Sequence, residues 1–304
     1  MKIEKLQTAL QPLQPEDTMP EAGRKILLED FITMLNYEDG ARSGGDIEDL
    51  HKMRVATRRM RSALRLLGDY YKPKVIKPFV KQLKTLADKL GKVRDLDVMI
   101  HDLRQLPNHE LMTDVFTELE SQRKVAREQL ASHLDSVKCQ TFFEKFAKFA
   151  SKPGKGAQTE DEDDGVIPYQ IRHILPVLIH DHLAIVKAYD TVLAEADIHT
   201  LHALRIAFKR LRYAISYFKS LLGSSIDGFA DELKTMQEYL GRLNDVHVAQ
   251  MRLSRLPQQD ILQQYIHDLA EEEVQLIAGF GEVWTKFNSR TVQRKLSDAL
   301  LVLR

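Results

Sequence analysis

The sequence predicts an all-α protein built of two antiparallel four-helix bundles related by internal pseudo-twofold symmetry. Three observations indicate this fold. Glycine and proline are sparse, with 14 and 10 among 304 residues, which favours helices because both residues disfavour helix interiors. No segment shows the alternation of apolar and polar residues that is typical of strands. A long basic segment also occurs twice, which implies two similar halves.

The repeated segment is a run of cations that returns at a constant offset. Residues 51–61 return as residues 202–212, 151 positions later. A second segment follows each copy, and residues 79–95 return as residues 229–245, 150 positions later. One residue is lost in the turn between the two segments. Each half is therefore expected to contain the same pair of helices.

Apolar periodicity and turn residues predict a succession of helices along the chain. The predicted helices span residues 20–38, 47–70, 73–104, 108–150, 167–195, 198–222, 225–255, 259–287 and 290–303. Turn residues bound them at Asp39-Gly40, Gly44-Gly45, Lys72-Pro73, Pro107-Asn108, Gly223-Ser224, Pro257 and Asn288-Ser289.

The clearest interruption is at residues 151–166, which contain glycines, a proline, five successive acids and almost no apolar residue. This composition predicts a flexible acidic linker. It separates a first four-helix half, residues 1–150, from a second four-helix half, residues 167–304. Residues 1–17 are also expected to be flexible.

Composition narrows the class of protein. The 43% hydrophobic and 29% charged residues are typical of globular proteins. No segment approaches the roughly 18 apolar residues that cross a membrane, and the N-terminus lacks the apolar core of a signal peptide. Cys139 is the only cysteine, so no disulfide can form within the chain. We therefore expect a cytoplasmic protein with no membrane partner.

The net charge of zero conceals a local concentration of cations. Residues 51–100 contain 14 lysines and arginines against 4 acids, whereas residues 1–50 contain 5 against 11. Such a concentration indicates a binding site rather than a uniformly basic surface.

A helical wheel places the repeated cations on one face and the apolar residues on the other. Charged faces are often simply solvated, but such faces mix signs because like charges one turn apart repel. Here five lysines and arginines lie between positions 51 and 61 with no acid, and both copies share the pattern. We interpret them as binding residues, together with cations of the following helix. The predicted set is His51, Arg54, Arg58, Arg59, Arg61, Arg65, Lys81, Lys84, Lys92 and Arg94, with His202, Arg205, Lys209, Arg210, Arg212, Lys234 and Arg242.

The dimensions and chemistry of this stripe suit a long phosphate chain. From His51 to Arg65 it extends roughly 21 Å at 1.5 Å per residue. The planar guanidinium of arginine donates two hydrogen bonds at once to phosphate. Few aromatic side chains accompany the cations, whereas proteins that bind single-stranded nucleic acid usually provide stacking platforms. The expected partner is inorganic polyphosphate or another phosphate-rich polyanion, and nucleic acid is less favoured.

The motifs resemble those of the CHAD domain, an α-helical domain named for its histidines. The matching residues are His51, Arg54, Arg58, Arg59, Arg61, Leu90, Gly91, Arg94, Asp95, Asp97 and Val98, then His202, Arg205, Lys209, Arg210, Arg212, Leu240, Gly241, Asn244 and Asp245. The resemblance extends over residues 20–290. It implies two four-helix bundles with a basic groove or pore between them.

The same resemblance implies binding of inorganic polyphosphate and association with polyphosphate granules. Members of this family often follow a CYTH triphosphatase domain, whose Glu-x-Glu-x-Lys signature does not occur in this sequence. It therefore resembles a stand-alone member, with granule proteins or CYTH-type triphosphatases as further partners. The second half has Asn244, His247 and Asp231 where the first has Arg94, Asp97 and Lys81, and is expected to contribute less.

Two other functions stay open. A metal-dependent phosphoanhydride hydrolase would need a metal ion bound to carboxylates such as Asp95 and Asp97. For Asp95 and its repeat Asp245, however, we favour a role in orienting neighbouring arginine and lysine side chains. A nucleic-acid-binding or scaffold protein is the other alternative. The basic neighbours of His51 and His202 repel a metal ion, and no phosphate loop or nucleophile elbow is found. We expect a non-enzymatic protein with no catalytic residue, metal or cofactor.

Gly91 and its repeat Gly241 interrupt two predicted helices at a cost of about 1 kcal/mol each relative to alanine. We expect them to permit a close crossing between helices.

Overall fold

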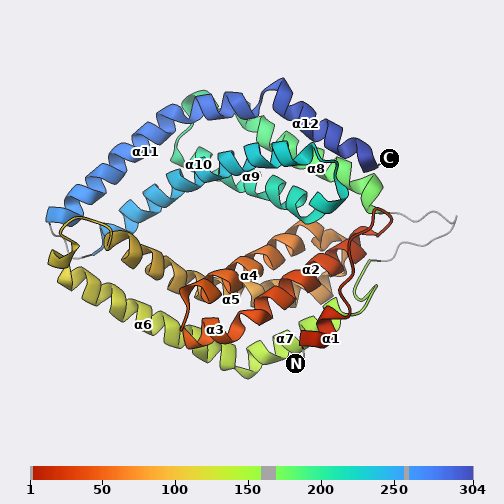
Figure 1. The fold of residues 1–304 in the computed structure, drawn as a ribbon, viewed down its shortest axis with the longest axis horizontal. Coiled ribbons are helices and arrows are strands. Elements are labelled where there is room, and N and C mark those ends of the chain that lie inside the picture. The colour runs from red at the N-terminus through yellow and green to blue at the C-terminus, as the bar shows by residue number, and fades with distance from the viewer. Residues whose placement is uncertain (1–2, 159–168, 257–259, 304) are drawn as a thin grey trace. The chain divides into compact units, whose positions relative to one another are not determined.

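A computed structural model describes residues 3–158, 169–256 and 260–303 (Figure 1). These residues form helices and no sheet; isolated β-bridges join Thr18 to Gln170 and Tyr71 to Ala157. The all-α class predicted from the sequence is confirmed. The chain divides into two compact units, Met1–Ile171 and Arg172–Arg304. Within the described ranges, no helix combines the length and apolar character needed to cross a bilayer.

Unit 1 is built around an aromatic core. Its helices are α1 (Ile3–Gln7), α2 (Met19–Asn36), α3 (Glu38–Ser43), α4 (Ile47–Leu67), α5 (Pro73–Leu103), α6 (Thr113–Asp135) and α7 (Val137–Ala150). α4 packs against α2 and α5, and α5 packs against α6 and α7. The core rings are those of Phe31, Tyr71, Phe79, Phe142, Phe143, Phe146 and Phe149.

Unit 2 has its own apolar core. Its helices are α8 (Ile171–Lys187), α9 (Ile198–Phe218), α10 (Ile226–Leu253), α11 (Asp260–Phe287) and α12 (Arg290–Leu300). α10 packs against α9, α11 and α12. Phe208, Phe229, Trp284 and Phe287 pack together, and the indole Nε1 of Trp284 donates a hydrogen bond of 2.8 Å to Asp190.

The repeated segments form helices of equal length with similar starts. α4 and α9 each contain 21 residues. Asp46 caps α4 by accepting from the Glu48 amide, and Asp197 caps α9 by accepting from the Thr200 amide, both at 2.8 Å. These bonds satisfy amides that have no partner within the helix. The α5 helix then begins at Pro73, where a missing amide hydrogen is tolerated.

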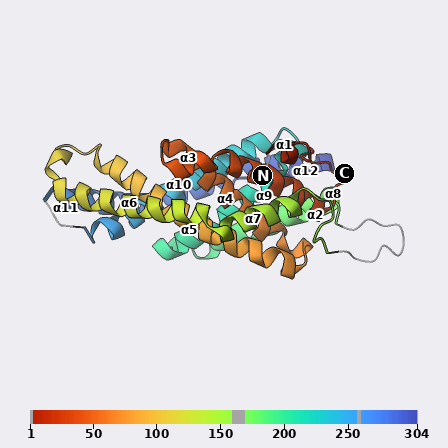
Figure 2. The same ribbon diagram turned by 90° about the horizontal axis from the view of Figure 1, so that it is seen from below.

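The single helix predicted for residues 108–150 is wrong. The structure has two helices there, α6 and α7, whose directions differ at their junction (Figure 1) although they lie nearly in line when seen from below (Figure 2). Ser136 adopts an extended conformation, with φ −66° and ψ 140°, and its hydroxyl accepts from the Cys139 amide at 3.2 Å. The chain therefore turns at a local N-cap, which apolar periodicity alone does not reveal.

The described part of the N-terminal segment, predicted to be flexible, belongs to unit 1 and contacts α2. It includes helix α1, whose Leu6 is buried. The ammonium group of Lys25 on α2 lies 2.7 Å from Asp17 and donates to the Pro12 carbonyl at 2.9 Å. These contacts tie residues up to Asp17 to the first long helix.

Part of the predicted linker contacts the segment that precedes α5. The Lys72 amide donates to the Gly156 carbonyl, and the Gln158 amide donates to the Tyr70 carbonyl, both at 2.9 Å. Unit 1 extends to Ile171, whose amide donates to the Asp17 carbonyl. The five acids at positions 160–164 lie outside the described residues.

Candidate functional site

The ten predicted binding residues of the first half lie on α4 and α5, which pack against each other (Figure 1). We call them the first basic face. The apolar residues of α4, among them Met53, Ala56, Met60 and Leu67, are buried in the core. That burial orients the cationic side of the helix outward. Arg65, Lys81, Lys84 and Lys92 are exposed, and the other six are half-buried.

Acids are few along the first basic face. α4 has six lysines and arginines, and its two acids, Glu48 and Asp49, lie in the first turn. There they interact favourably with the helix dipole. α5 has seven lysines and arginines against four aspartates. The two helices together therefore present a strong excess of positive charge.

Two of the four aspartates of α5, Asp95 and Asp97, pair with arginines. Asp95 lies 3.9 Å from the guanidinium of Arg54 on α4, which agrees with the predicted role of orienting a neighbouring cation. Asp97 is buried, and its Oδ1 lies 3.2 Å from Arg123 and 3.4 Å from Arg127 of α6. Across the described ranges, no group of three or more histidine, cysteine or carboxylate side chains could hold a metal ion.

Arg59 is held by the core of unit 1. Its Nε donates to the Oδ1 of Asp30 on α2 at 2.6 Å, and Asp30 is only 4% exposed. Burial raises the pKa of Asp30 to about 6, although Arg59 opposes the shift. Among the predicted binding residues, Arg59 therefore has a structural contact that fixes α4 against α2.

His51 is surrounded by cations at the start of the first basic face. Burial, and then the charge of Arg94, lower the pKa of its imidazole; Glu48 opposes this shift, and Arg54 and Arg58 add to it. Within the described residues, the Nδ1 of His51 and the Nε of Arg58 are buried without a hydrogen-bond partner. A phosphate beside His51 would favour its protonated form by adding a nearby negative charge.

The seven predicted binding residues of the second half lie on α9 and α10; we call them the second basic face. The Nδ1 of His202 donates to the Oδ1 of Asn244 at 2.8 Å. Arg205, Lys209 and Arg212 are half-buried. The Arg212 guanidinium also lies 5.6 Å from the centre of the Tyr213 ring.

Acids partly neutralise the second basic face. Arg242 binds Glu272 of α11 through two hydrogen bonds, at 2.6 and 2.5 Å. Lys234 lies 3.7 Å from Glu238, one helical turn away. α10 carries five acids and only three lysines and arginines. The expectation of a less basic second half agrees with these contacts.

The sequence prediction missed Arg123 and Arg127 of α6, which hold Asp97. The repeat contains a signal for this contact, because Asp97 and Arg123 correspond at an offset of 150 to His247 and Glu273. In unit 2 the Nδ1 of His247 lies 3.2 Å from Glu273. The two units thus use the same positions for a contact between a carboxylate and a nitrogen-bearing side chain, with the two roles exchanged.

The expected close helix crossing at Gly91 and Gly241 is wrong. A β-carbon placed on either glycine would meet no atom within 4 Å, apart from its own helix and chain neighbours. Packing therefore does not require glycine at either position.

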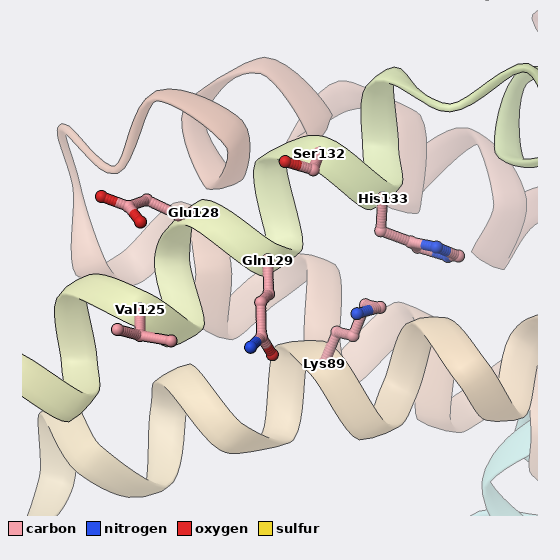
Figure 3. A pocket seen from close by; sticks show the side chains of 6 residues that line it. All are labelled: Lys89, Val125, Glu128, Gln129, Ser132 and His133. Atoms are coloured by element: carbon pink, nitrogen blue, oxygen red, sulfur yellow. The ribbon is translucent and has the colours of Figure 1, made fainter.

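A shallow pocket of about 540 Å³ lies between α5 and α6, lined by Lys89, Val125, Glu128, Gln129, Ser132 and His133. Lys89 of α5 and Gln129 of α6 both extend into the space between the two helices (Figure 3). At the equivalent position in unit 2, Tyr239 packs against Phe280 and donates to the Leu276 carbonyl at 2.7 Å. The aromatic ring fills the corresponding space in the second copy.

Comparisons with known proteins identify relatives of the whole fold. The family model described as CHAD domain matches residues 25–254. The crystal structure of the CHAD domain from the plant Ricinus communis is 24% identical, with 97% of this chain and 95% of that chain covered and a TM-score of 0.65. PptA from Streptomyces chartreusis is 15% identical, with 88% and 99% covered and a TM-score of 0.64. A comparison with curated proteins found no match.

Proposed function

The chain belongs to the CHAD domain family, and we propose that it binds inorganic polyphosphate, or a similar phosphate-rich polyanion, without changing it chemically. The observation that carries this proposal is the first basic face. There, two packed helices expose lysines and arginines with few acids between them. A long anion is the ligand that such an extended cationic surface favours.

Arginine and lysine have distinct roles in this proposal. The guanidinium groups of Arg54, Arg58 and Arg61 are half-buried, so their hydrogen bonds to phosphate oxygens are partly shielded from water. The exposed ammonium groups of Lys81 and Lys84 act as point charges that attract the chain over a longer range. Because a polyanion releases counterions when it binds, the affinity is expected to fall steeply with salt.

The similar starts and lengths of α4 and α9 support the interpretation that the halves are two copies of one four-helix bundle. Each copy contributes a basic face, and the first contributes more. Arg242 and Lys234 of the second face already have acidic partners. A bound phosphate would have to compete with these carboxylates.

Calorimetric titration with polyphosphate tests the proposal. The double variant Arg58→Glu with Lys209→Glu should lower the affinity by about a hundredfold, because each change removes a charge-assisted contact and adds repulsion. The matched control is Lys145→Glu with Lys187→Glu, an equal charge change at exposed positions of α7 and α8. Equal losses in the two double variants would reduce the effect to net charge and contradict the proposal.

The alternative functions predict different results in the same system. A phosphoanhydride hydrolase would release phosphate in the presence of Mg²⁺ or Mn²⁺, and Asp95→Asn would abolish that release. A nucleic-acid-binding protein would bind duplex or single-stranded nucleic acid in preference to polyphosphate in a competition titration. We expect no phosphate release and a preference for polyphosphate.

A further inference from the structure

Gly91 and Gly241 lie inside long helices without a structural reason for being glycine. Glycine is less favourable in a helix than alanine, and both positions have open space where a β-carbon would project. Neither residue has the positive φ that glycine tolerates, since among described glycines that conformation is found at Gly44, Gly154 and Gly156. Glycine occupies the same place in both repeats, although neither packing nor backbone conformation requires it. This recurrence indicates a functional requirement for glycine.

Gly91 lies on the part of α5 that borders α4. Arg94 and Asp95, three and four positions later, share its side of the helix. Asp95 pairs with Arg54, and Arg94 influences His51, so this side of α5 meets the cationic side of α4.

The register of the two helices places the cations of α4 beside Gly91. α4 and α5 are consecutive, packed helices joined by a short turn, so they run in opposite directions. One turn back from Asp95 to Gly91 corresponds to one turn forward from Arg54 to Arg58. This register places Gly91 across from Arg58 and one turn from the pair of Asp95 and Arg54. The buried Nε of Arg58 has no partner in the described residues.

The second unit has the same arrangement. The contact between His202 and Asn244 sets the register of α9 and α10. One turn back from Asn244 lies Gly241, and one to two turns forward from His202 lie Arg205 and Lys209. In both units, a glycine thus lies near the cations at the centre of the basic face.

We propose that a phosphate group bound to the first basic face lies directly over the backbone at Gly91, and that a phosphate group bound to the second basic face lies in the same way over Gly241. This inference rests on the proposed function and identifies where the ligand comes closest to the protein. The glycine backbone donates no hydrogen bond to the phosphate, because amides inside a helix already donate to helix carbonyls. Glycine instead leaves room for the phosphate to approach the helix. Without a side chain at these positions, the phosphate approaches the neighbouring cations, and electrostatic attraction strengthens as the separation falls.

Substitution by leucine tests this inference, because leucine is a good helix former that would fill the open space. Gly91→Leu should lower the polyphosphate affinity by about tenfold, the effect of losing one charge-assisted contact. Gly241→Leu should act in the same direction, and Gly91→Ala should have a smaller effect. The thermal unfolding midpoint should be unchanged or higher in all three variants.

Gly281→Leu is the matched control. Gly281 is an exposed position inside α11, a helix that carries none of the predicted binding residues, and a β-carbon there also meets no atom within 4 Å. This variant should bind polyphosphate like the wild type. If Gly91→Leu and Gly241→Leu also bind like the wild type, or if Gly281→Leu loses as much affinity as they do, the inference is wrong while the proposed function stands. Failure of the unmodified protein to bind polyphosphate would instead refute the proposed function.

Discussion

Asp30 shows how a single buried carboxylate determines the role of a surface cation. Its Oδ1 binds Arg59 at 2.6 Å, while its Oδ2 is buried with no partner in the described residues. Desolvation therefore dominates, and the pKa of Asp30 is raised from 3.8 to about 6. A carboxyl with a raised pKa retains its proton in the folded protein at pH values where the unfolded chain has lost it. Its stabilising contribution is complete below about pH 4 and is lost as the pH rises through about 6.

The variant Asp30→Asn isolates this contribution, because its amide does not titrate. The free energy of unfolding of the wild type, relative to this variant, should fall by about 3 kcal/mol between pH 4 and pH 7, since each pKa unit is worth about 1.4 kcal/mol. Urea unfolding at the two pH values measures the difference. Parallel pH profiles for the two proteins would show that Asp30 titrates normally.

Two elements, α5 and α6, are joined by the buried ion pair of Asp97. Both Arg123 and Arg127 approach its Oδ1, and Arg127 also donates to the Gly44 carbonyl at 3.0 Å. A carboxylate this deeply buried is stable only with such partners. The pair therefore connects α5 to α6 and to the end of α3.

Asp97→Asn should lower the free energy of unfolding by about 2 kcal/mol, because two arginines lose their charged partner. Chemical denaturation followed by circular dichroism measures the change. The control is Asp102→Asn, an exposed position on the same helix, where the effect should be within about 0.5 kcal/mol. Equal destabilisation by the two variants would mean that the pairing of Asp97 with Arg123 and Arg127 adds nothing to the free energy of unfolding beyond the loss of one negative charge.

The pairing of α10 with α11 limits the second basic face. The guanidinium of Arg242 is bound by Glu272. The equivalent positions in unit 1 are Lys92 and Gln122, so no carboxylate stands where unit 2 has Glu272. One carboxylate therefore accounts for part of the difference between the two faces.

Glu272→Gln should increase the affinity for polyphosphate by up to about fivefold, because an exposed ion pair contributes at most about 1 kcal/mol. Titration at low salt measures the change. The control Glu282→Gln removes an equal charge from an exposed position further along α11 and should have a smaller effect. An unchanged affinity for Glu272→Gln would show that Arg242 takes no part in binding.

At the scale of the whole molecule, the two units differ in charge distribution despite their shared pattern. α5 has an excess of cations and α10 an excess of acids. Because a ligand stabilises the segments it binds, polyphosphate should slow amide hydrogen exchange in α4 and α5 more than in α9 and α10. Mass spectrometry of peptides from the free and the ligand-bound protein makes this comparison. Stronger protection in α9 and α10 would contradict the proposed asymmetry.

The sequence by itself determined the helical class, the repeated helix pairs and the face on which their cations lie. These features depend on local patterns, namely apolar periodicity and capping residues such as Asp46 and Asp197. The predicted spans of the two basic helices end within a few residues of α4 and α9. The resemblance to the CHAD domain, read from the repeated motif, is confirmed by the family match.

Only the tertiary structure decided which charged residues are held by partners. Arg59 is fixed by Asp30, Asp97 by Arg123, and Arg242 by Glu272, each across 26 to 30 positions of the chain. No local pattern identifies such partners, because they meet only when separate helices pack. The open space at Gly91 is likewise a property of packing, since the sequence shows a missing side chain but not what surrounds it.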